Sequence, residues 1–172
     1  ASDLLAPANA VASLGLEWLQ VLSRASGVAG MCGGQALDID ATGASQSLAA
    51  LQRMHALKTG ALIRAAVRMG AAAGGANKDE LRHLDDFAAA LGLAFQVRGD
   101  ILDIEASSEQ LGKTAGKDVA QAKSTYPALL GMHGATSKLE ELANSMHTAL
   151  ATFGTRSDAL KALGELAINR AH

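Results

Sequence analysis

Two carboxylates in the middle of the chain have the spacing that a shared divalent cation requires. Asp100 and Asp103 stand three residues apart in the segment FQVRGDILD (95–103), so on a helix they lie about one turn apart. Gln96 falls on the same narrow stripe, and the positions on both sides of it are mostly apolar. An unpaired buried carboxylate costs several kcal/mol, so these groups must line a wet cleft or bind cations. They indicate a Mg²⁺ site; the alternative is a solvated helix face.

A lysine and a hydroxyl group interrupt a second apolar segment, ALKTGALI (56–63). Lys58 supplies a point charge and Thr59 a short hydrogen-bond donor, and together they can bind a phosphate group. The alternative is a lysine whose methylene stem packs on the apolar face while its ammonium group reaches water. The phosphate interpretation therefore requires that other polar groups share the same cleft.

Two further segments carry polar groups that could belong to such a cleft. Residues 112–123 contain glycines and three lysines, among them Lys113 and Lys123. This composition suits a lid that closes over an anion, although the spacing is not that of a P-loop; a solvated basic loop is the alternative. Gln35 and Asp38 stand three residues apart. They could add polar groups to the cleft, or they could cap the end of a helix.

The composition favours a single all-α domain over residues 1–172. Hydrophobic residues make up 49% of the chain but aromatic residues only 3%, so the core is expected to consist of alanine, leucine, valine and methionine. Only two prolines are present, which permits long helices. With a net charge of -2, the chain lacks the excess of positive charge that would indicate binding to nucleic acid or to an anionic membrane. A single cysteine and the lack of a membrane-spanning apolar run predict a cytoplasmic protein.

The elements that must position these residues are helices. Apolar periodicity predicts about seven of them and no strand. Asn77 and Glu80 have the spacing of a capping box, Ser137 and Glu140 are expected to begin another helix, and Ser157 is expected to cap the last one. The predicted helices cover residues 8–26, 35–40, 48–73, 77–105, 126–132, 137–153 and 157–170, with loops at 27–34, 42–47 and 106–123.

Four sequence blocks follow one another in an order that is typical of one enzyme family. They are GMCGGQALDID (30–40), HALKTGALIRAAV (55–67), GLAFQVRGDILD (92–103) and LGKTAGKD with KSTYP (111–127). With these blocks the chain resembles, over essentially all of its length, the C-terminal half of bacterial trans-isoprenyl diphosphate synthases. The most similar group is that of the farnesyl diphosphate synthases (geranyltranstransferases). The resemblance implies an all-α bundle of the isoprenoid synthase type, around a deep cavity and normally in a homodimer.

The resemblance also implies a reaction. Isopentenyl diphosphate would be joined to an allylic diphosphate, geranyl or dimethylallyl, to make farnesyl diphosphate, with Mg²⁺ clamping the leaving diphosphate. Asp100 and Asp103 match metal ligands of the family. The residues that match substrate positions are Lys58, which would contact the allylic diphosphate, Thr59 beside the reacting carbons, Gln96, which would orient the substrate, Lys113 and Lys123 of the lid, and Gln35 and Asp38 of the cleft floor.

Two departures from the family pattern bear on activity. The family's acidic motif begins with two adjacent aspartates, and Gly99 replaces the first of them, which is usually a direct Mg²⁺ ligand. Restoring that aspartate is expected to tighten the binding of Mg²⁺ and diphosphate. The family's other aspartate-rich motif lies upstream of this sequence. We therefore expect the isolated chain to be inactive and activity to belong to a longer parent; the alternative is a non-catalytic subunit that dimerises with a catalytic partner.

Overall fold

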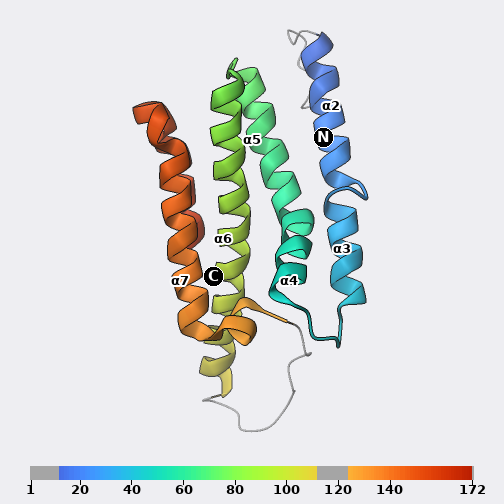
Figure 1. Ribbon diagram of the computed structural model, residues 1–172, viewed down its shortest axis with the longest axis vertical. Coiled ribbons are helices and arrows are strands. Elements are labelled where there is room, and N and C mark those ends of the chain that lie inside the picture. Colours follow the sequence, from blue (N-terminus) through green and yellow to red (C-terminus); the bar gives the residue numbers. More distant parts are fainter. Residues whose placement is uncertain (1–11, 112–123, 172) are drawn as a thin grey trace.

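The computed structural model describes residues 12–111 and 124–171, and within these ranges it contains helices and no strand (Figure 1). The predicted all-α class is thereby confirmed. Two short elements are not α-helical, because η1 is a π-helix and η2 a 3-10 helix. In chain order the elements are α2 (Ala12–Ser26), α3 (Met31–Asp40), α4 (Leu48–His55), η1 (Ala56–Gly60), α5 (Ala61–Ala73), α6 (Lys78–Leu111), α7 (Tyr126–Leu150), η2 (Ala151–Ser157) and α8 (Asp158–Asn169).

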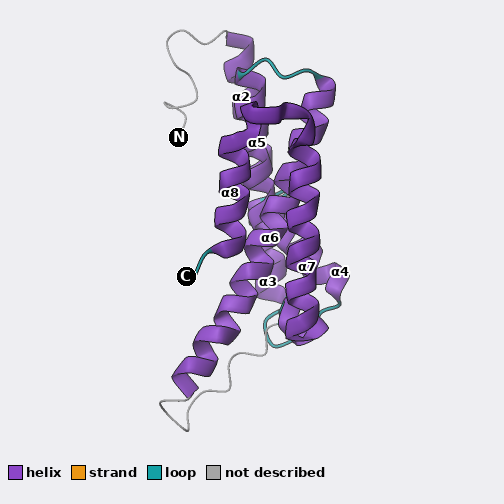
Figure 2. Ribbon diagram, turned by 90° about the vertical axis from the view of Figure 1, so that its left-hand side faces the viewer, coloured by secondary structure: helices purple, strands orange, loops and turns teal. Residues whose placement is uncertain are grey.

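Helix α6 runs through the middle of the bundle. It packs against α7 on one side and against α5 on the other, while α2 lies beyond α5 (Figure 1). Helix α8 contacts both α6 and α7 (Figure 2). The α6 side chains of Phe87, Leu91, Val97 and Ile101 are all buried, so this helix supplies much of the core. None of the described helices is long and apolar enough to cross a membrane.

The N-terminus of α6 is fixed by the predicted capping box. The Asn77 side-chain oxygen accepts hydrogen bonds from the backbone N–H groups of Asp79 and Glu80, both at 3.0 Å. In return, the Glu80 carboxylate accepts a hydrogen bond from the Asn77 N–H at 3.0 Å. This reciprocal arrangement satisfies donors that the first turn of a helix leaves free. The prediction for this helix start is confirmed.

Two helices extend further than the sequence predicted. Helix α3 begins at Met31, so Gly33 and Gly34 are helical and the prediction of a loop through residue 34 is wrong. Helix α6 continues to Leu111, past the predicted end at residue 105. In α3 the reason is a packing contact: Gly34 is buried, and its lack of a side chain matters for the neighbouring element, as described below.

Two glycines break the helical path near the C-terminus. Gly131 (φ 73) separates the first residues of α7 from the rest, close to the predicted break after residue 132, and Gly154 (φ 57) interrupts η2. A positive φ of this kind favours glycine. Ser137 lies inside α7, so the prediction that it begins a helix is wrong. Ser157 stands at the N-cap position of α8, as predicted, but its side chain makes no capping hydrogen bond, because its hydroxyl donates to the carbonyl oxygens of Leu150 and Gly154 instead.

A π-helix replaces one turn of the predicted helix 48–73. This element, η1, carries Lys58 and Thr59, and π turns often occur at functional sites. Its backbone lies against the backbones of α3 and α6. A Cβ atom on Gly34 of α3 would overlap the backbone of Lys58, and one on Gly92 of α6 would lie 3.0 Å from the Cα atom of Gly60. Because both glycines lack a side chain, α3 and α6 can pack closely against η1 from two sides.

Replacing the first of these glycines is expected to destabilise the chain. Gly34→Ala should lower the free energy of unfolding by about 3 kcal/mol, the upper part of the range for overpacked cores, because backbone cannot yield as a side chain can. Gly70→Ala is the matched control, since no atom lies within 4 Å of the added methyl group; it should stabilise α5 by about 0.5–1 kcal/mol. Urea unfolding measures both changes. A Gly34→Ala midpoint equal to that of the wild type would contradict the close backbone contact between α3 and η1.

Candidate active site

One cavity of about 230 Å³ brings together polar side chains from distant parts of the sequence. Asp38 comes from α3, His55 from α4, Lys58 from η1, and Asp100 and Asp103 from α6. Residues just before α7 complete the lining. Four of the residues predicted from sequence therefore line the same cavity. The arrangement places one lysine among three carboxylates, with room beside them for a ligand.

Lys58 is oriented by a carboxylate on the neighbouring helix. Its ammonium group donates a hydrogen bond to Asp38 Oδ2 at 2.7 Å, and the two groups form an ion pair. The Lys58 side chain is 35% exposed and that of Asp38 only 16%, so the pair is partly shielded from water while the lysine still reaches the cavity. An ammonium group has three donors. Lys58 can therefore keep its bond to Asp38 and donate to a phosphate oxygen as well.

A second hydrogen bond joins η1 to α6. The Gln96 amide nitrogen donates to Thr59 Oγ1 at 3.0 Å. This contact depends on the close approach of the two elements at Gly60 and Gly92. It fixes the orientation of the Gln96 amide one turn before Asp100. Thr59 and Gln96 therefore form a polar bridge next to the residues that line the cavity.

Asp100 is held by the first residue of α7. Its Oδ2 atom accepts a hydrogen bond from the Tyr126 N–H at 2.9 Å. Burial raises the pKa of Asp100 to about 6, the Tyr126 N–H acts in the opposite direction, and the nearby Asp103 carboxylate adds to the increase. At neutral pH the carboxylate is still mostly ionised, and a bound cation would lower its pKa again. Asp103 is exposed.

His55 is a cavity residue that the sequence analysis did not predict. The residue is only 7% exposed, and neither ring nitrogen has a hydrogen-bond partner. Its ring stacks against that of Tyr126, with 6.1 Å between the centroids. Burial lowers the pKa of His55 to about 4, and the Lys58 charge adds to this while Asp38 opposes it. The signal that could have found it is its position three residues before Lys58, on the same face of a helix.

Thr59 and Gln96 lie next to the lining residues, and three other predicted site residues remain. Gln35 is exposed and is not one of the lining residues. On α3, Asp38 pairs with Lys58 while Gln35 lies outside this cavity, so the place of Gln35 in the cleft floor stays a prediction. Lys113 and Lys123 lie outside the described residues, so the predicted lid stays a prediction.

Asp100 and Asp103 are the residues that could hold a divalent cation. Both line the cavity, and they stand one helical turn apart. Within residues 14–106 and 124–171 no group of three or more histidine, cysteine, aspartate or glutamate side chains has a metal-binding arrangement. Mg²⁺ is commonly bound by one or two carboxylates, with water and substrate phosphates completing its shell. The pair therefore fits a hydrated Mg²⁺ that binds together with a phosphate ligand.

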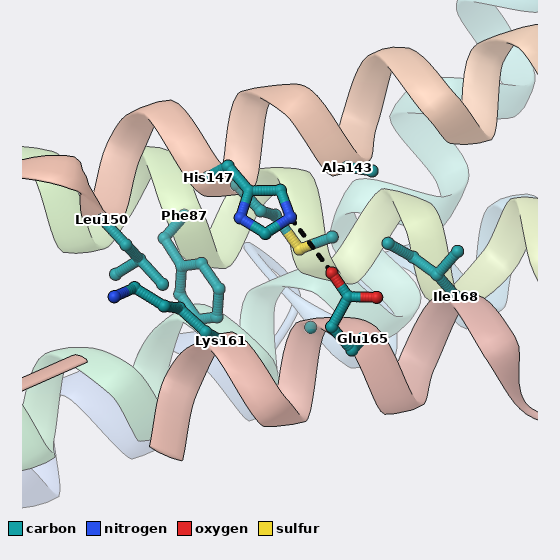
Figure 3. Close-up of a pocket in the computed structure, with 9 residues that line it drawn as sticks. Phe87, Ala143, His147, Leu150, Lys161, Glu165 and Ile168 are labelled. Carbon is teal, nitrogen blue, oxygen red and sulfur yellow. Dashed lines mark hydrogen bonds and ion pairs between the residues drawn. The ribbon is translucent and has the colours of Figure 1, made fainter. Parts of the chain in front are cut away.

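A smaller cavity between α7 and α8 is not a second active site (Figure 3). His147 Nε2 lies 3.0 Å from Glu165 Oε1, and Phe87 and Lys161 also line this cavity. Its volume is about 10 Å³, which is the space of about one water molecule. It cannot hold a substrate. The cavity at Lys58 has room for a ligand beside charged side chains of α3, η1 and α6, and it is the candidate site.

The buried histidine predicts a pH-dependent stability. Between pH 6.5 and 4 the folded chain binds fewer protons at His55 than the unfolded chain does, so the free energy of unfolding falls as the pH is lowered through this window. His55→Gln removes this loss. The free energy of unfolding of the wild type minus that of the variant should fall by on the order of 2 kcal/mol between pH 7 and pH 4.

Urea titrations at several pH values measure this difference. The raised pKa of Asp100 acts with the opposite sign, because that carboxylate binds more protons when folded. It is present in both proteins and largely cancels in the comparison. A constant difference between wild type and His55→Gln over this pH range would contradict the buried neutral histidine.

Comparisons with known proteins agree on one family. The polyprenyl synthetase family model matches residues 4–163. The farnesyl diphosphate synthase of Escherichia coli (strain K12) is 48% identical over 159 residues, which is 90% of this chain and 53% of the relative. That of Geobacillus stearothermophilus is 46% identical over 127 residues, 74% of this chain and 43% of the relative. The chain thus spans about half the length of these curated relatives.

A solved structure supports the same assignment. The crystal structure of an FPP/GFPP synthase from Zymomonas mobilis is similar with a TM-score of 0.83 at 32% sequence identity. The match covers 96% of this chain and 56% of that one. The agreement in both sequence and structure confirms the resemblance that the four sequence blocks predicted. The chain belongs to the polyprenyl synthetase family.

Proposed function

We propose that this chain forms the C-terminal half of a Mg²⁺-dependent prenyltransferase that makes farnesyl diphosphate. The substrates are isopentenyl diphosphate and an allylic diphosphate, geranyl or dimethylallyl. The observation that carries the proposal is the convergence of Lys58, Asp38, Asp100 and Asp103 on one cavity. A lysine that binds phosphate and a carboxylate pair that binds Mg²⁺ are the groups that a diphosphate leaving group needs.

The proposed reaction moves one electron pair at each substrate. The carbon–oxygen bond of the allylic substrate breaks, and its electron pair leaves with the diphosphate. The double bond of isopentenyl diphosphate attacks the allylic carbon, and a proton is then lost. Lys58 would stabilise the charge that develops on the leaving diphosphate, since a fixed cation is already in position when that charge appears. Mg²⁺ held by Asp100 and Asp103 would supply further positive charge to the same group.

Thr59 and Gln96 would position the substrate. Their hydrogen bond holds both side chains next to Lys58 and Asp100, so the allylic carbons would lie beside them when the diphosphate is bound. A substrate that is already held in a reactive orientation loses less entropy on the way to the transition state. We further propose that the residues of a longer protein complete the site, and that this protein is a homodimer.

Removing the lysine should weaken binding of one substrate. In the complete protein, Lys58→Ala is expected to raise the KM for the allylic diphosphate at least about tenfold, because a charge-assisted hydrogen bond to the diphosphate is lost. The KM for isopentenyl diphosphate should change little. Lys78→Ala is the control, since Lys78 is exposed at the start of α6. An effect on the KM for isopentenyl diphosphate alone would show that the role of Lys58 is assigned wrongly.

The 172-residue chain alone should not catalyse prenyl transfer. It carries one carboxylate pair, and the family's other aspartate-rich motif is not in its sequence, so half of the metal-binding charge is missing. Incubation of the purified chain with radiolabelled isopentenyl diphosphate, geranyl diphosphate and Mg²⁺ tests this. The complete protein is the positive control. Labelled farnesyl diphosphate formed by the chain alone would contradict the expectation that the site needs both halves.

A further inference from the structure

The side chain of Arg170, which follows the end of α8, lies against α6 beside Gly99. A Cβ atom on Gly99 would be 3.0 Å from Arg170 Nη2. That nitrogen donates to the Phe95 carbonyl oxygen at 3.1 Å, and the guanidinium carbon lies 3.9 Å from the centre of the Phe95 ring. The Arg170 carbonyl oxygen accepts from Arg98 Nε at 3.0 Å. These contacts hold the guanidinium group where a side chain at position 99 would begin.

Arg170 keeps hydrogen-bond donors for a ligand. A guanidinium group has five N–H donors. The contact to Phe95 uses one donor of Nη2 and the Nε donor is buried without a partner, so the Nη1 donors and the second Nη2 donor are left for a ligand. No carboxylate among the described side chains forms an ion pair with it. A partly buried cation that no protein carboxylate neutralises favours an anion. Its planar fork also matches two oxygens of a phosphate group.

Position 99 borders the candidate site. Gly99 directly precedes Asp100 and stands one turn before Asp103, and both aspartates line the cavity. Side chains one turn apart on a helix have Cβ atoms about 5–6 Å apart. Arg170 is not itself one of the lining residues, but its guanidinium group packs at Gly99, the residue next to this carboxylate pair. Lys58 lines the same cavity from η1.

We propose that Arg170 is a built-in cation that binds an oxygen of the substrate diphosphate, in the place where a first aspartate would hold Mg²⁺. The proposal rests on the proposed function of the cavity. A carboxylate with bound Mg²⁺ carries a net charge of one, and a guanidinium group carries the same charge. Gly99 and Arg170 act together, because an aspartate at position 99 would form an ion pair with Arg170 and neutralise it.

The first test measures pyrophosphate binding to the complete protein by isothermal titration calorimetry at fixed MgCl₂. Arg170→Gln should weaken binding about tenfold or more. Arg170→Lys should bind with an intermediate affinity, because it keeps the charge and loses the fork. Arg68→Gln, a change of an exposed arginine on α5, should leave binding unchanged. An unchanged affinity in Arg170→Gln would overturn the proposal.

The second test adds the carboxylate. Gly99→Asp should weaken pyrophosphate binding in the presence of Arg170, since the new carboxylate pairs with the guanidinium group and repels the ligand. In Arg170→Gln the same change should make binding depend more steeply on the MgCl₂ concentration. Tighter binding in the single variant Gly99→Asp would instead support the expectation from the sequence, that position 99 is a metal ligand position, and would overturn the role of Arg170.

Thermal unfolding separates ligand binding from a structural role. If Arg170→Gln lowers Tm without changing the pyrophosphate affinity, Arg170 only fastens the chain end to α6, and the proposal is wrong. The proposed function has its own control in these experiments. Wild-type protein that binds no pyrophosphate would contradict the proposed function itself. Binding that Lys58→Ala weakens and Arg170→Gln does not would overturn the role of Arg170 alone.

Discussion

Steric contact between three backbones at η1 is the constraint on which the candidate site depends. Gly34 and Gly92 carry no Cβ atom, so α3 and α6 both approach this element closely. Their approach brings a carboxylate of α3 to Lys58 and brings Gln96 to Thr59. Hydrogen bonds weaken beyond about 3.2 Å, so a wider spacing of the helices would remove both contacts. The chemistry of the cavity therefore follows from backbone packing.

The opposite wall of the cavity depends on a residue with two roles. Asp100 lines the cavity and also accepts the Tyr126 N–H, which fixes the start of α7. Beside it, the Gln46 N–H donates to Ser124 Oγ at 2.8 Å and ties the segment between α3 and α4 to the residues before α7. The raised pKa of Asp100 is the cost of this arrangement, because the fold buries a carboxylate that would be more stable in water. The lining of the cavity and the start of α7 thus depend on the same side chain.

Features that depend on neighbouring residues in the chain were predictable, and features that depend on distant contacts were not. The capping box at Asn77 is local, and its prediction is confirmed. The helical spacing of Asp100 and Asp103 predicts that they share a face, and both line one cavity. The same spacing of Gln35 and Asp38 left open whether they join the cleft, and only the packing of α3 shows that Asp38 lines the cavity while Gln35 is exposed. Glycine near residue 34 suggested a loop because it is a poor helix former. The contact with η1, far along the chain, makes glycine necessary there. No residue composition is particular to a π turn, so the sequence did not predict η1.

The π-helix also sets the rotational phase between α4 and α5. A π turn accommodates one residue more than an α turn, so the helix faces before and after η1 are offset by about 100° from those of a continuous α-helix. Leu51 and Met54 are buried before it and Ala65 after it. The loss of one residue within Ala56–Gly60 would leave α4 and α5 unchanged in sequence, yet it would turn one of these buried faces toward solvent. The fold therefore sets the length of this segment, and a one-residue insertion or deletion within it is expected to disrupt the packing of α4 or α5.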